Sequence, residues 1–498
     1  MASVVSGGEG VSEKKEVAGF EAFALERYFA IYEFSGAKLL CCSDCEPLTQ
    51  KEVLEMADSE TRSLWDNLTL GYTESAGLPQ LRKEVAKSYT KGNIDEQDVT
   101  IVCPEEGIYL SIRALVSKGD EVVVTSPAYQ SLTEIAKACG AALKTWNPVV
   151  DEANDGALRF DIDDFSALVT AQTKLVIINF PHNPTGCQLS REDFDKIISV
   201  CESHKSYLFS DEMYRGLELD EGAQNPAACE AYERAVSLSG MSKVYAMPGL
   251  RIGWLASRCA ELNAKVRMLK DYTTICPPAP SEILALIGLR AGKSIIDRNL
   301  AIIRENCKAV DAFMERHKGT FRWKRPVAGS FAFPSLRDKD DSIMKRCKEW
   351  VEEGNVMLLP SPLYEFGDSH FRLGLGRVDA KEVLELWEQY LLKASPRGAI
   401  AAPRPNTFVC RKCGHTLFTA SELCGADMHT ITSECESYFL SEPMDWMGYS
   451  EGKTLCPNCE TRIGTLKWSG CKCSCGTWVS PGVQIPHSRI DAKYRKLE

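Results

Sequence analysis

A lysine with an arginine a short distance after it is the first feature of the chain that could carry covalent chemistry. Lys243 closes the segment 239–243, Ser-Gly-Met-Ser-Lys, and Arg251 follows eight residues later. A lysine amine can trap an aldehyde covalently, while Ser242 and Arg251 can hydrogen-bond and neutralise a phosphate. Pyridoxal phosphate carries both groups, so the spacing predicts this cofactor. Taken alone, the pair could also be a surface lysine beside a turn.

Two upstream segments predict neighbouring strands of a parallel sheet. Residues 174–180 form an apolar run that is typical of a buried strand, and residues 207–210 form a second, shorter one. Between them, Ser190 is expected to cap a helix whose apolar residues recur at helical spacing. This order predicts a strand-helix-strand crossover, and open α/β sheets bind ligands in the loops at the carboxyl ends of such strands.

The residues that follow these strands suit a pyridine ring. Asn183 lies in the loop after the first strand, and Asp211 ends the second strand, three residues before Tyr214. A carboxylate can keep the ring nitrogen protonated, so that the ring withdraws electrons. Asn183 and Tyr214 can hydrogen-bond the phenolic oxygen of the ring. Each residue alone has an ordinary explanation as part of a turn or cap, but their order on one sheet favours a cofactor site.

Over roughly residues 20 to 395 the chain resembles the class I and II aminotransferases, which are fold-type I pyridoxal phosphate enzymes. The resemblance rests on the residues above, on Tyr72 with residues 77–82, on Pro-Ala-Tyr at 127–129 and on Phe-Arg-Leu-Gly at 371–374. It implies a homodimer in which Tyr72 reaches the cofactor phosphate of the neighbouring subunit. It also implies that Tyr129 stacks on the cofactor ring and that Arg372 clamps the substrate α-carboxylate. Core packing of Tyr129 and a solvated charge at Arg372 are the alternative interpretations.

Two positions depart from the pattern of this family. Residues 103–107 read Cys-Pro-Glu-Glu-Gly where many members have a small Gly-Ala pair, and Pro104 has no N–H to donate to a phosphate. The serine often found three residues before the lysine is Gly240 here. We therefore expect backbone contacts to the phosphate that differ from those of the family. The acidic first turn and the apolar face of residues 108–115 still predict a helix.

The spacing of the cysteines changes beyond a linker rich in proline and alanine. The chain has 21 cysteines, and before the linker they are mostly lone residues in apolar stretches. Past it, two Cys-x-x-Cys pairs, one Cys-x-Cys pair and a lone Cys435 follow. Paired thiols on tight turns suit tetrahedral zinc. Disulfides are the rival interpretation, which the lack of a secretion signal disfavours.

This tail of about 90 residues closely resembles the C-terminal zinc-binding domain of the dual-specificity phosphatase 12 family, whose phosphatase domain is absent here. The matching segments are 410–413, 435–447, 455–459 and 473–478. The resemblance implies two structural zinc ions. We group the ligands of the first site as Cys410, Cys413, Cys456 and Cys459. The second site would use Cys435, Cys473, Cys475 and His487, with His429 or Cys471 as substitutes for the last.

Length and composition predict several domains and exclude some classes of protein. The 498 residues exceed one ordinary core, and a net charge of -11 argues against a nucleic-acid-binding surface over the whole chain. No apolar run approaches the roughly 20 residues of a membrane span. The acidic N-terminus has no apolar signal core, so we expect a cytoplasmic protein, with the nucleus as an alternative location.

The predicted fold is an α/β fold-type I transferase with a mostly parallel central sheet and a small α/β domain, followed by a small β-rich zinc-binding domain. The predicted boundaries are a disordered lead-in at 1–19, the transferase at 20–395, a linker at 396–406 and the zinc-binding domain at 407–498. Within the transferase, the large domain covers about 55–290, and the small domain combines 20–54 with 291–395.

The predicted function is pyridoxal phosphate-dependent transamination of an amino acid to an oxo acid. Lys243, displaced by the substrate amine, would move the α-proton, while Asp211 would stabilise the carbanion through the ring nitrogen. Elimination, decarboxylation or cyclisation on the same scaffold is one alternative, because the fold does not fix which bond breaks. A binding protein whose zinc module recruits a protein or RNA partner is the other. Residues 272–282 contain no arginine, which disfavours aspartate and glutamate as donors.

Overall fold

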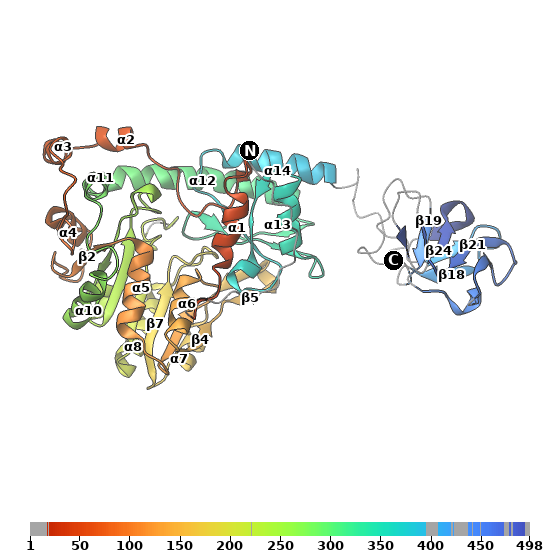
Figure 1. The fold of residues 1–498 in the computed structure, drawn as a ribbon, viewed down its shortest axis with the longest axis horizontal. Coiled ribbons are helices and arrows are strands. Elements are labelled where there is room, and N and C mark those ends of the chain that lie inside the picture. The colour runs from red at the N-terminus through yellow and green to blue at the C-terminus, as the bar shows by residue number, and fades with distance from the viewer. Residues whose placement is uncertain are drawn as a thin grey trace. The chain divides into compact units, whose positions relative to one another are not determined.

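A seven-stranded sheet organises the longer, N-terminal part of the chain in this computed structural model (Figure 1). The strand order is β2-β10-β9-β8-β7-β3-β4, and β10 alone runs antiparallel to its neighbours. This confirms the prediction of a mostly parallel sheet. The strands are Val99–Val102 (β2), Glu121–Thr125 (β3), Ala142–Trp146 (β4), Thr173–Asn179 (β7), Tyr207–Asp211 (β8), Ala235–Gly240 (β9) and Gly253–Ala256 (β10).

The structure describes residues 17, 19–220, 222–394, 407–419, 422, 437–440, 442–448, 450–472, 478–479 and 482–493. The chain divides into two compact units, Met1–Leu391 and Leu392–Glu498. The predicted linker at 396–406 and nearly all of the predicted lead-in at 1–19 lie outside the described residues, so both remain predictions.

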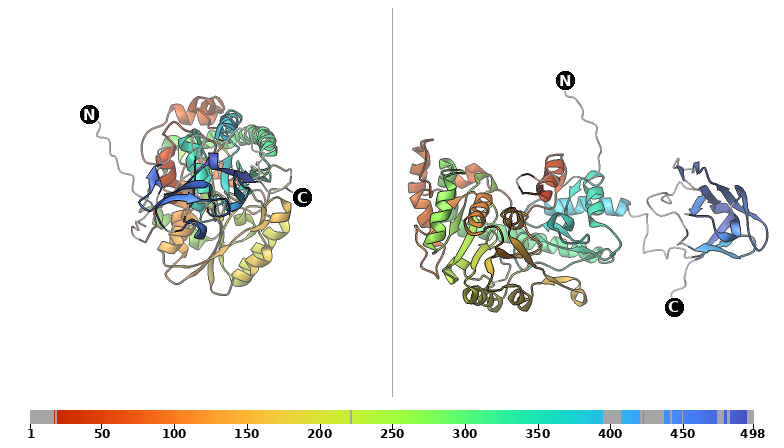
Figure 2. Two further views of the ribbon diagram at one scale, coloured as in Figure 1. Left: turned by 90° about the vertical axis from the view of Figure 1, so that its right-hand side faces the viewer. Right: turned by 60° about the horizontal axis from the view of Figure 1, so that its bottom comes forward.

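Helices cover both faces of the central sheet, which explains why its strands are apolar throughout (Figures 1 and 2). In β7, Leu175 and Ile177 pack in the core on one face, whereas Val176 and Ile178 pack in the core on the other. The first core includes side chains of α5, α6 and α10, and the second includes those of α7 and α8. These helices are Pro104–Leu115 (α5), Ser131–Ala138 (α6), Ile162–Leu168 (α7), Arg191–His204 (α8) and Ala260–Lys270 (α10).

The predicted crossover between the two apolar strands is confirmed. The side chain of Ser190 accepts a hydrogen bond from the backbone N–H of Asp193 and caps α8. The strands β7 and β8 on either side of this helix pair in parallel. The helix predicted over residues 108–115 is also present as part of α5.

Further helices complete the larger unit, and none of the helices in the described residues combines the length and apolar character needed to cross a bilayer. The longest, α12, carries charged residues along its length. The helices are Gln50–Glu55 (α2), Ser59–Asp66 (α3), Pro79–Lys87 (α4), Ala228–Ala231 (α9), Ala279–Arg290 (α11) and Gly292–Arg316 (α12). A hairpin of Val149–Asp151 (β5) and Ala157–Arg159 (β6) extends from the sheet region.

A smaller α/β layer brings the N-terminal segment 40–46 against a C-terminal strand. The N–H of Gly374 donates to Leu40 O at 2.8 Å, and the N–H of Glu46 donates to Gly376 O at 2.8 Å. A Cβ on Gly374 would lie 2.4 Å from Cys42 O, so this close approach requires glycine. The elements are Ala24–Tyr32 (α1), Lys38–Leu39 (β1), Phe321–Arg322 (β11), Phe331–Ala332 (β12), Ser335–Leu336 (β13), Ile343–Glu352 (α13), Val356–Met357 (β14), Leu359–Pro360 (β15), Phe371–Gly374 (β16) and Ala380–Ala394 (α14).

The described part of the C-terminal unit is β-rich, as predicted (Figure 2). Two small sheets, β18-β17-β25 and β19-β24-β21-β20, enclose a core in which the rings of Phe408 and Phe418 stack at 4.7 Å. The strands are Thr407–Cys410 (β17), Thr416–Thr419 (β18), Ser437–Leu440 (β19), Gly452–Leu455 (β20), Arg462–Lys467 (β21), Cys471–Lys472 (β22), Trp478–Val479 (β23), Gly482–Pro486 (β24) and Ile490–Lys493 (β25).

Candidate active site and cysteine cluster

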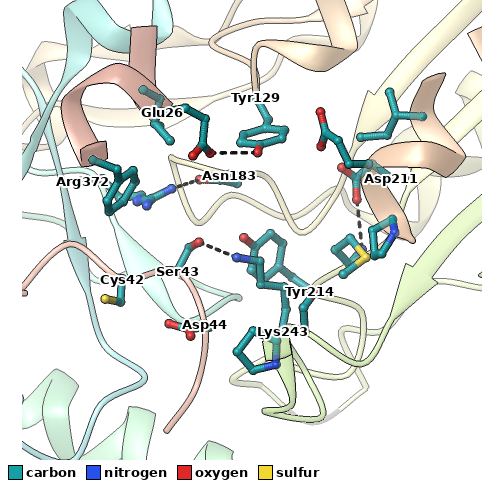
Figure 3. A pocket seen from close by; sticks show the side chains of 18 of the residues that line it. Glu26, Cys42, Ser43, Asp44, Tyr129, Asn183, Asp211, Tyr214, Lys243 and Arg372 are labelled. Atoms are coloured by element: carbon teal, nitrogen blue, oxygen red, sulfur yellow. Dashed lines mark hydrogen bonds between the residues drawn. The ribbon is translucent and has the colours of Figure 1, made fainter. Parts of the chain in front are cut away.

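A cavity of about 370 Å³ opens at the carboxyl ends of the parallel strands (Figure 3). Because β7, β8 and β9 run in the same direction, the residues that follow them gather at one edge of the sheet. Asn183, Asp211 and Lys243 all line the cavity, as do Tyr129, Tyr214 and Arg372. The structure therefore brings together six of the residues that the sequence singled out.

Asn179, at the end of β7, ties two of these loops together. Its side-chain amide donates to Asp211 O at 3.0 Å, and its Oδ1 accepts the backbone N–H of Asn183 at 3.0 Å. The sequence analysis did not identify this residue. Asn179 is a polar residue near the end of the apolar run 174–180. This position indicates a specific role, because a buried amide needs hydrogen-bond partners.

Arg372 is a buried cation without a carboxylate partner among the described residues. Its side chain is only 3% exposed. Nε donates to Cys41 O at 3.0 Å, and Nη1 donates to Asn183 Oδ1 at 3.2 Å. A guanidinium held in place by neutral oxygens and lining a cavity is suited to bind an anion there. The solvated strand-end charge considered as an alternative is therefore wrong.

Asp211 is a buried carboxyl group that is 7% exposed. It lines the cavity on the side opposite Arg372 (Figure 3). Burial raises its pKa to about 7, although the backbone N–H of Met213, 3.1 Å from Oδ1, opposes this shift. A cationic nitrogen placed beside Asp211 would favour the ionised form again. The site thus provides a carboxylate whose charge a positively charged ligand would stabilise.

Lys243 points its amine into the cavity and donates a hydrogen bond to Ser43 Oγ at 2.9 Å (Figure 3). Burial lowers the pKa of Lys243, and the nearby charge of Asp44 opposes this effect. Ser43 is itself fixed, because Ser330 Oγ donates to its carbonyl oxygen at 2.6 Å. The sequence analysis did not identify Ser43, which lies 200 residues from its partner.

Two tyrosines complete the walls of the cavity. The hydroxyl of Tyr129 donates to Glu26 Oε1 at 3.3 Å, and its ring packs on Phe23 at 5.1 Å between centroids. Tyr214 is buried, with its ring against the edge of Phe331 at 4.7 Å. Glu26 belongs to α1 and is another residue that the sequence analysis did not identify.

Pro104 and Gly240, which depart from the family pattern, lie close together at the first turn of α5. A Cβ on Gly240 would lie 3.2 Å from Pro104 Cγ, and one on Gly253 would lie 2.8 Å from the same atom. The proline ring therefore occupies space that two glycines leave free. Ser242 and Arg251 line the cavity beside this turn, and Arg251 Nη2 lies 3.4 Å from Cys103 Sγ.

Tyr72 lies away from the cavity of its own chain. Its side chain is 92% exposed, which is unusual for a tyrosine. The predicted role of Tyr72 in a neighbouring subunit remains a prediction.

In the C-terminal unit, two similar turns bring four cysteines together. The Sγ atoms of Cys410, Cys413, Cys456 and Cys459 all lie within 4.8 Å of one another. The closest pairs are 3.7 and 3.6 Å apart, near the roughly 3.8 Å separation of sulfurs bound to one tetrahedral zinc at about 2.3 Å. The described cysteines form no disulfide, so the rival interpretation is wrong for this cluster.

Most ligands of the predicted second zinc site, Cys435, Cys473 and Cys475, lie outside the described residues, as does His429. His487 and Cys471 are described. The ring of His487 packs on Tyr438 at 4.2 Å, and Cys471 begins β22. The second site therefore remains a prediction.

The sheet topology and the cavity at its strand ends define the class, a fold-type I pyridoxal phosphate enzyme. Residues 39–389 match the family model of class I and II aminotransferases, and the chain belongs to this family. The protein is accordingly an enzyme of the pyridoxal phosphate-dependent aminotransferase class. This agrees with the resemblance identified from the sequence motifs.

Several known proteins are similar over most of this region. A probable aspartate aminotransferase of Methanocaldococcus jannaschii is 28% identical over 355 residues, 67% of this chain and 89% of that protein. An arginine-pyruvate transaminase of Pseudomonas aeruginosa is 30% identical over 327 residues, 62% of this chain and 80% of the other. The solved structure of a PLP-dependent aminotransferase from Streptococcus suis aligns with a TM-score of 0.68 and 25% identity, covering 76% of this chain and 98% of that one.

Proposed function

We propose that the protein transfers an amino group from an amino acid to an oxo acid at the cavity described above, with pyridoxal phosphate as cofactor. The observation that carries the proposal is the meeting of Lys243, Asp211 and Arg372 around one cavity. The amine matches the cofactor aldehyde, and the carboxyl group matches the ring nitrogen. The guanidinium, which has no counter-ion among the described residues, matches the substrate carboxylate. The residues present therefore fit the cofactor.

The proposed binding roles follow from position in the cavity. Ser242 and Arg251 would hold the phosphate, and Tyr72 of a second subunit would reach it in a homodimer. Asn183 and Tyr214 would hydrogen-bond the phenolic oxygen, with Tyr129 stacked on the ring. When bound, pyridoxal phosphate supplies an aldehyde that captures amines and a ring that withdraws electrons.

Lys243 is the proposed acid-base group. A buried amine whose pKa is lowered is easier to deprotonate near neutral pH, and a neutral amine can accept the substrate α-proton. The hydroxyl of Ser43 would hold that amine in position. Arg372 would orient the substrate by binding its carboxylate through two parallel hydrogen bonds.

Half-reactions of the purified holoenzyme with single amino acids test this proposal. Absorbance changes of the cofactor report the reaction, and mass spectrometry of the products separates transamination from elimination, decarboxylation and cyclisation. Conversion of an amino acid to its oxo acid is the expected outcome. Loss of carbon dioxide or a side-chain group instead would assign one of the alternative reactions.

Replacement of the lysine provides a second test. We expect Lys243→Ala to lower turnover by more than about 10⁴-fold, since both the covalent attachment and the base are lost. Lys196→Ala removes an exposed lysine of α8 and should leave turnover unchanged. Borohydride reduction followed by peptide mass spectrometry should find the cofactor on Lys243. Cofactor trapped on another lysine would contradict the assignment.

We further propose that Cys410, Cys413, Cys456 and Cys459 bind one zinc ion with a structural role. The backbone N–H of His415 lowers the pKa of Cys413, and the hydroxyl and backbone N–H of Thr461 lower the pKa of Cys459 to about 6. Both effects favour the thiolates that zinc binds. Four sulfurs leave no open coordination position for catalysis. Measurement of metal content per chain tests this assignment.

A further inference from the structure

The wall of the cavity formed by α1 carries two acidic side chains. Leu25, Glu26, Phe29 and Glu33 line the cavity, and their spacing places them on one face of this helix. Neither Glu26 nor Glu33 forms an ion pair with a described lysine or arginine. Among the described residues, the side chain of Glu26 accepts a hydrogen bond from the hydroxyl of Tyr129, at 3.3 Å (Figure 3).

The arrangement is unfavourable for the protein alone. Burial and the charges of Glu26 and Asp44 raise the pKa of Glu33, so these carboxylates repel one another, although the charge of Arg377 opposes this shift. Glu33 also caps the C-terminal end of α1, where the helix dipole disfavours a negative charge. Two glutamates that share one wall of a cavity and pair with no described lysine or arginine are suited to hold a cationic ligand.

The cations that line the cavity either form an ion pair with another residue or are assigned to the cofactor or the substrate carboxylate. The guanidinium of Arg377 donates to both carboxylate oxygens of Asp44, at 2.9 and 3.1 Å, so this pair neutralises itself. Lys243 and Arg251 belong to the proposed cofactor site. Arg372, 3% exposed and without a described counter-ion, provides an anchor for a carboxylate.

We propose that the cavity takes amino acids whose side chain ends in an amine or a guanidine, and that Glu26 and Glu33 determine this specificity. The inference rests on the proposed transamination and names its substrate class. Arg372 would bind the α-carboxylate, and the substrate side chain would extend toward the face of α1. A dicarboxylic substrate is disfavoured, because Arg377 would have to leave Asp44 and the second carboxylate would approach Glu26 and Glu33.

The direct test compares substrates of similar length in the holoenzyme half-reaction. We expect kcat/KM for L-arginine, L-lysine or L-ornithine to exceed that for L-norleucine by at least about tenfold, with L-glutamate the poorest. Glu26→Gln and Glu33→Gln should each reduce the ratio of L-arginine to L-norleucine by about tenfold. Glu192→Gln, which removes an exposed charge from α8, should leave the ratio unchanged.

Binding of an unreactive ligand gives a readout that does not depend on turnover. Calorimetry on the wild-type holoenzyme would compare 5-guanidinopentanoate with hexanoate, since both carry a carboxylate and neither has an α-amine to react. The guanidine compound should bind at least about tenfold more tightly, and this difference should shrink in both glutamine variants. Circular dichroism checks that the variants fold, and the wild-type comparison stands even if one does not.

The two proposals fail in different ways. If no amino acid reacts with the holoenzyme, transamination itself is contradicted. If neutral or acidic amino acids react as well as cationic ones, or if Glu26→Gln and Glu33→Gln both keep the wild-type preference, the substrate inference alone is overturned.

Discussion

The two units of the chain use their functional residues in opposite ways. In the transferase unit, the apolar core runs along both faces of the sheet, while Lys243, Asn183 and Arg372 stand outside it and face a cavity. In the C-terminal unit, Cys410 and Cys456 are members of the core itself, each 1% exposed. The first unit can therefore fold and then bind its cofactor. With the proposed zinc bound at this cluster, the second would depend on the metal for part of its folding free energy.

Core size explains this difference. A unit as short as the C-terminal one buries a smaller fraction of its surface than a large domain, and small domains commonly rely on metals or disulfides for stability. The described cysteines form no disulfide. The comparison therefore predicts that metal removal affects one unit strongly and the other little.

The largest expected effect is that of chelation on the C-terminal unit. Structural zinc contributes about 10 kcal/mol to the folding of small zinc domains, so a strong chelator should unfold residues 407–493. The transferase unit should keep its fold and its transaminase activity, because the cofactor residues all belong to it. Hydrogen exchange measured by mass spectrometry can follow the two units separately in the full chain.

A cysteine substitution and a measurement of the number of zinc ions per chain complete this test. Cys413→Ser should reproduce the effect of chelation, whereas Cys259→Ser, in the transferase unit, should not. Two zinc ions per chain would support the predicted second site, and one would limit binding to the described cluster. A C-terminal unit that stays folded without metal would remove the contrast between the two units.

An intermediate effect is expected for the substrate clamp. Arg372→Ala should weaken amino-acid binding by about 2 to 5 kcal/mol, because a buried, charge-assisted contact to a carboxylate is lost. The affinity for pyridoxal phosphate should change far less. Spectral titration of the holoenzyme with amino acids measures the first quantity, and cofactor titration of the apoenzyme measures the second.

Arg346 provides a matched control for this variant. Its side chain is 46% exposed and pairs with Asp341 at 2.8 Å on the surface of α13. Arg346→Ala should change neither affinity, because exposed ion pairs contribute about 1 kcal/mol or less and this one lies away from the cavity. Unchanged amino-acid affinity in Arg372→Ala would show that the clamp lies elsewhere.

Local patterns in the sequence predicted the parts of the molecule that local rules determine. The apolar runs at 174–180 and 207–210, the cap at Ser190 and the two Cys-x-x-Cys turns each depend on a few neighbouring residues, and the structure confirms these. Asn183 and Asp211, which line the cavity, followed from their order along one parallel sheet, whereas Tyr129 and Arg372 followed from the family resemblance.

Two residues that reach the cavity from the N-terminal part of the chain were not predicted. Ser43 meets Lys243 across 200 residues of sequence, and Glu26 meets Tyr129 across 103. Ser43 belongs to the segment 40–46, which hydrogen-bonds to β16 and its extension, and Glu26 belongs to α1. Periodicity and spacing carry no information on such contacts, which depend on how the layers of the unit pack together.

The smallest expected effect concerns the packing at the first turn of α5. Gly240→Ala adds a Cβ 2.9 Å from Gly253 Cα and 3.2 Å from Pro104 Cγ, so strands or helix must shift. Overpacking of this kind costs about 1 to 3 kcal/mol. We expect urea unfolding of the transferase unit to show this loss, while the transition of the C-terminal unit stays unchanged.

Two further variants test whether the close approach of a Cβ at position 240 causes the loss of stability. Gly319→Ala places its Cβ where no atom lies within 4 Å, and it should change stability by less than about 1 kcal/mol. Gly240→Ser restores the residue often found in the family, yet it carries the same Cβ and should be as destabilising as Gly240→Ala. If the serine variant is as stable as the wild type, Pro104 and Gly240 are not a compensating pair. The departures from the family pattern would then be independent of each other.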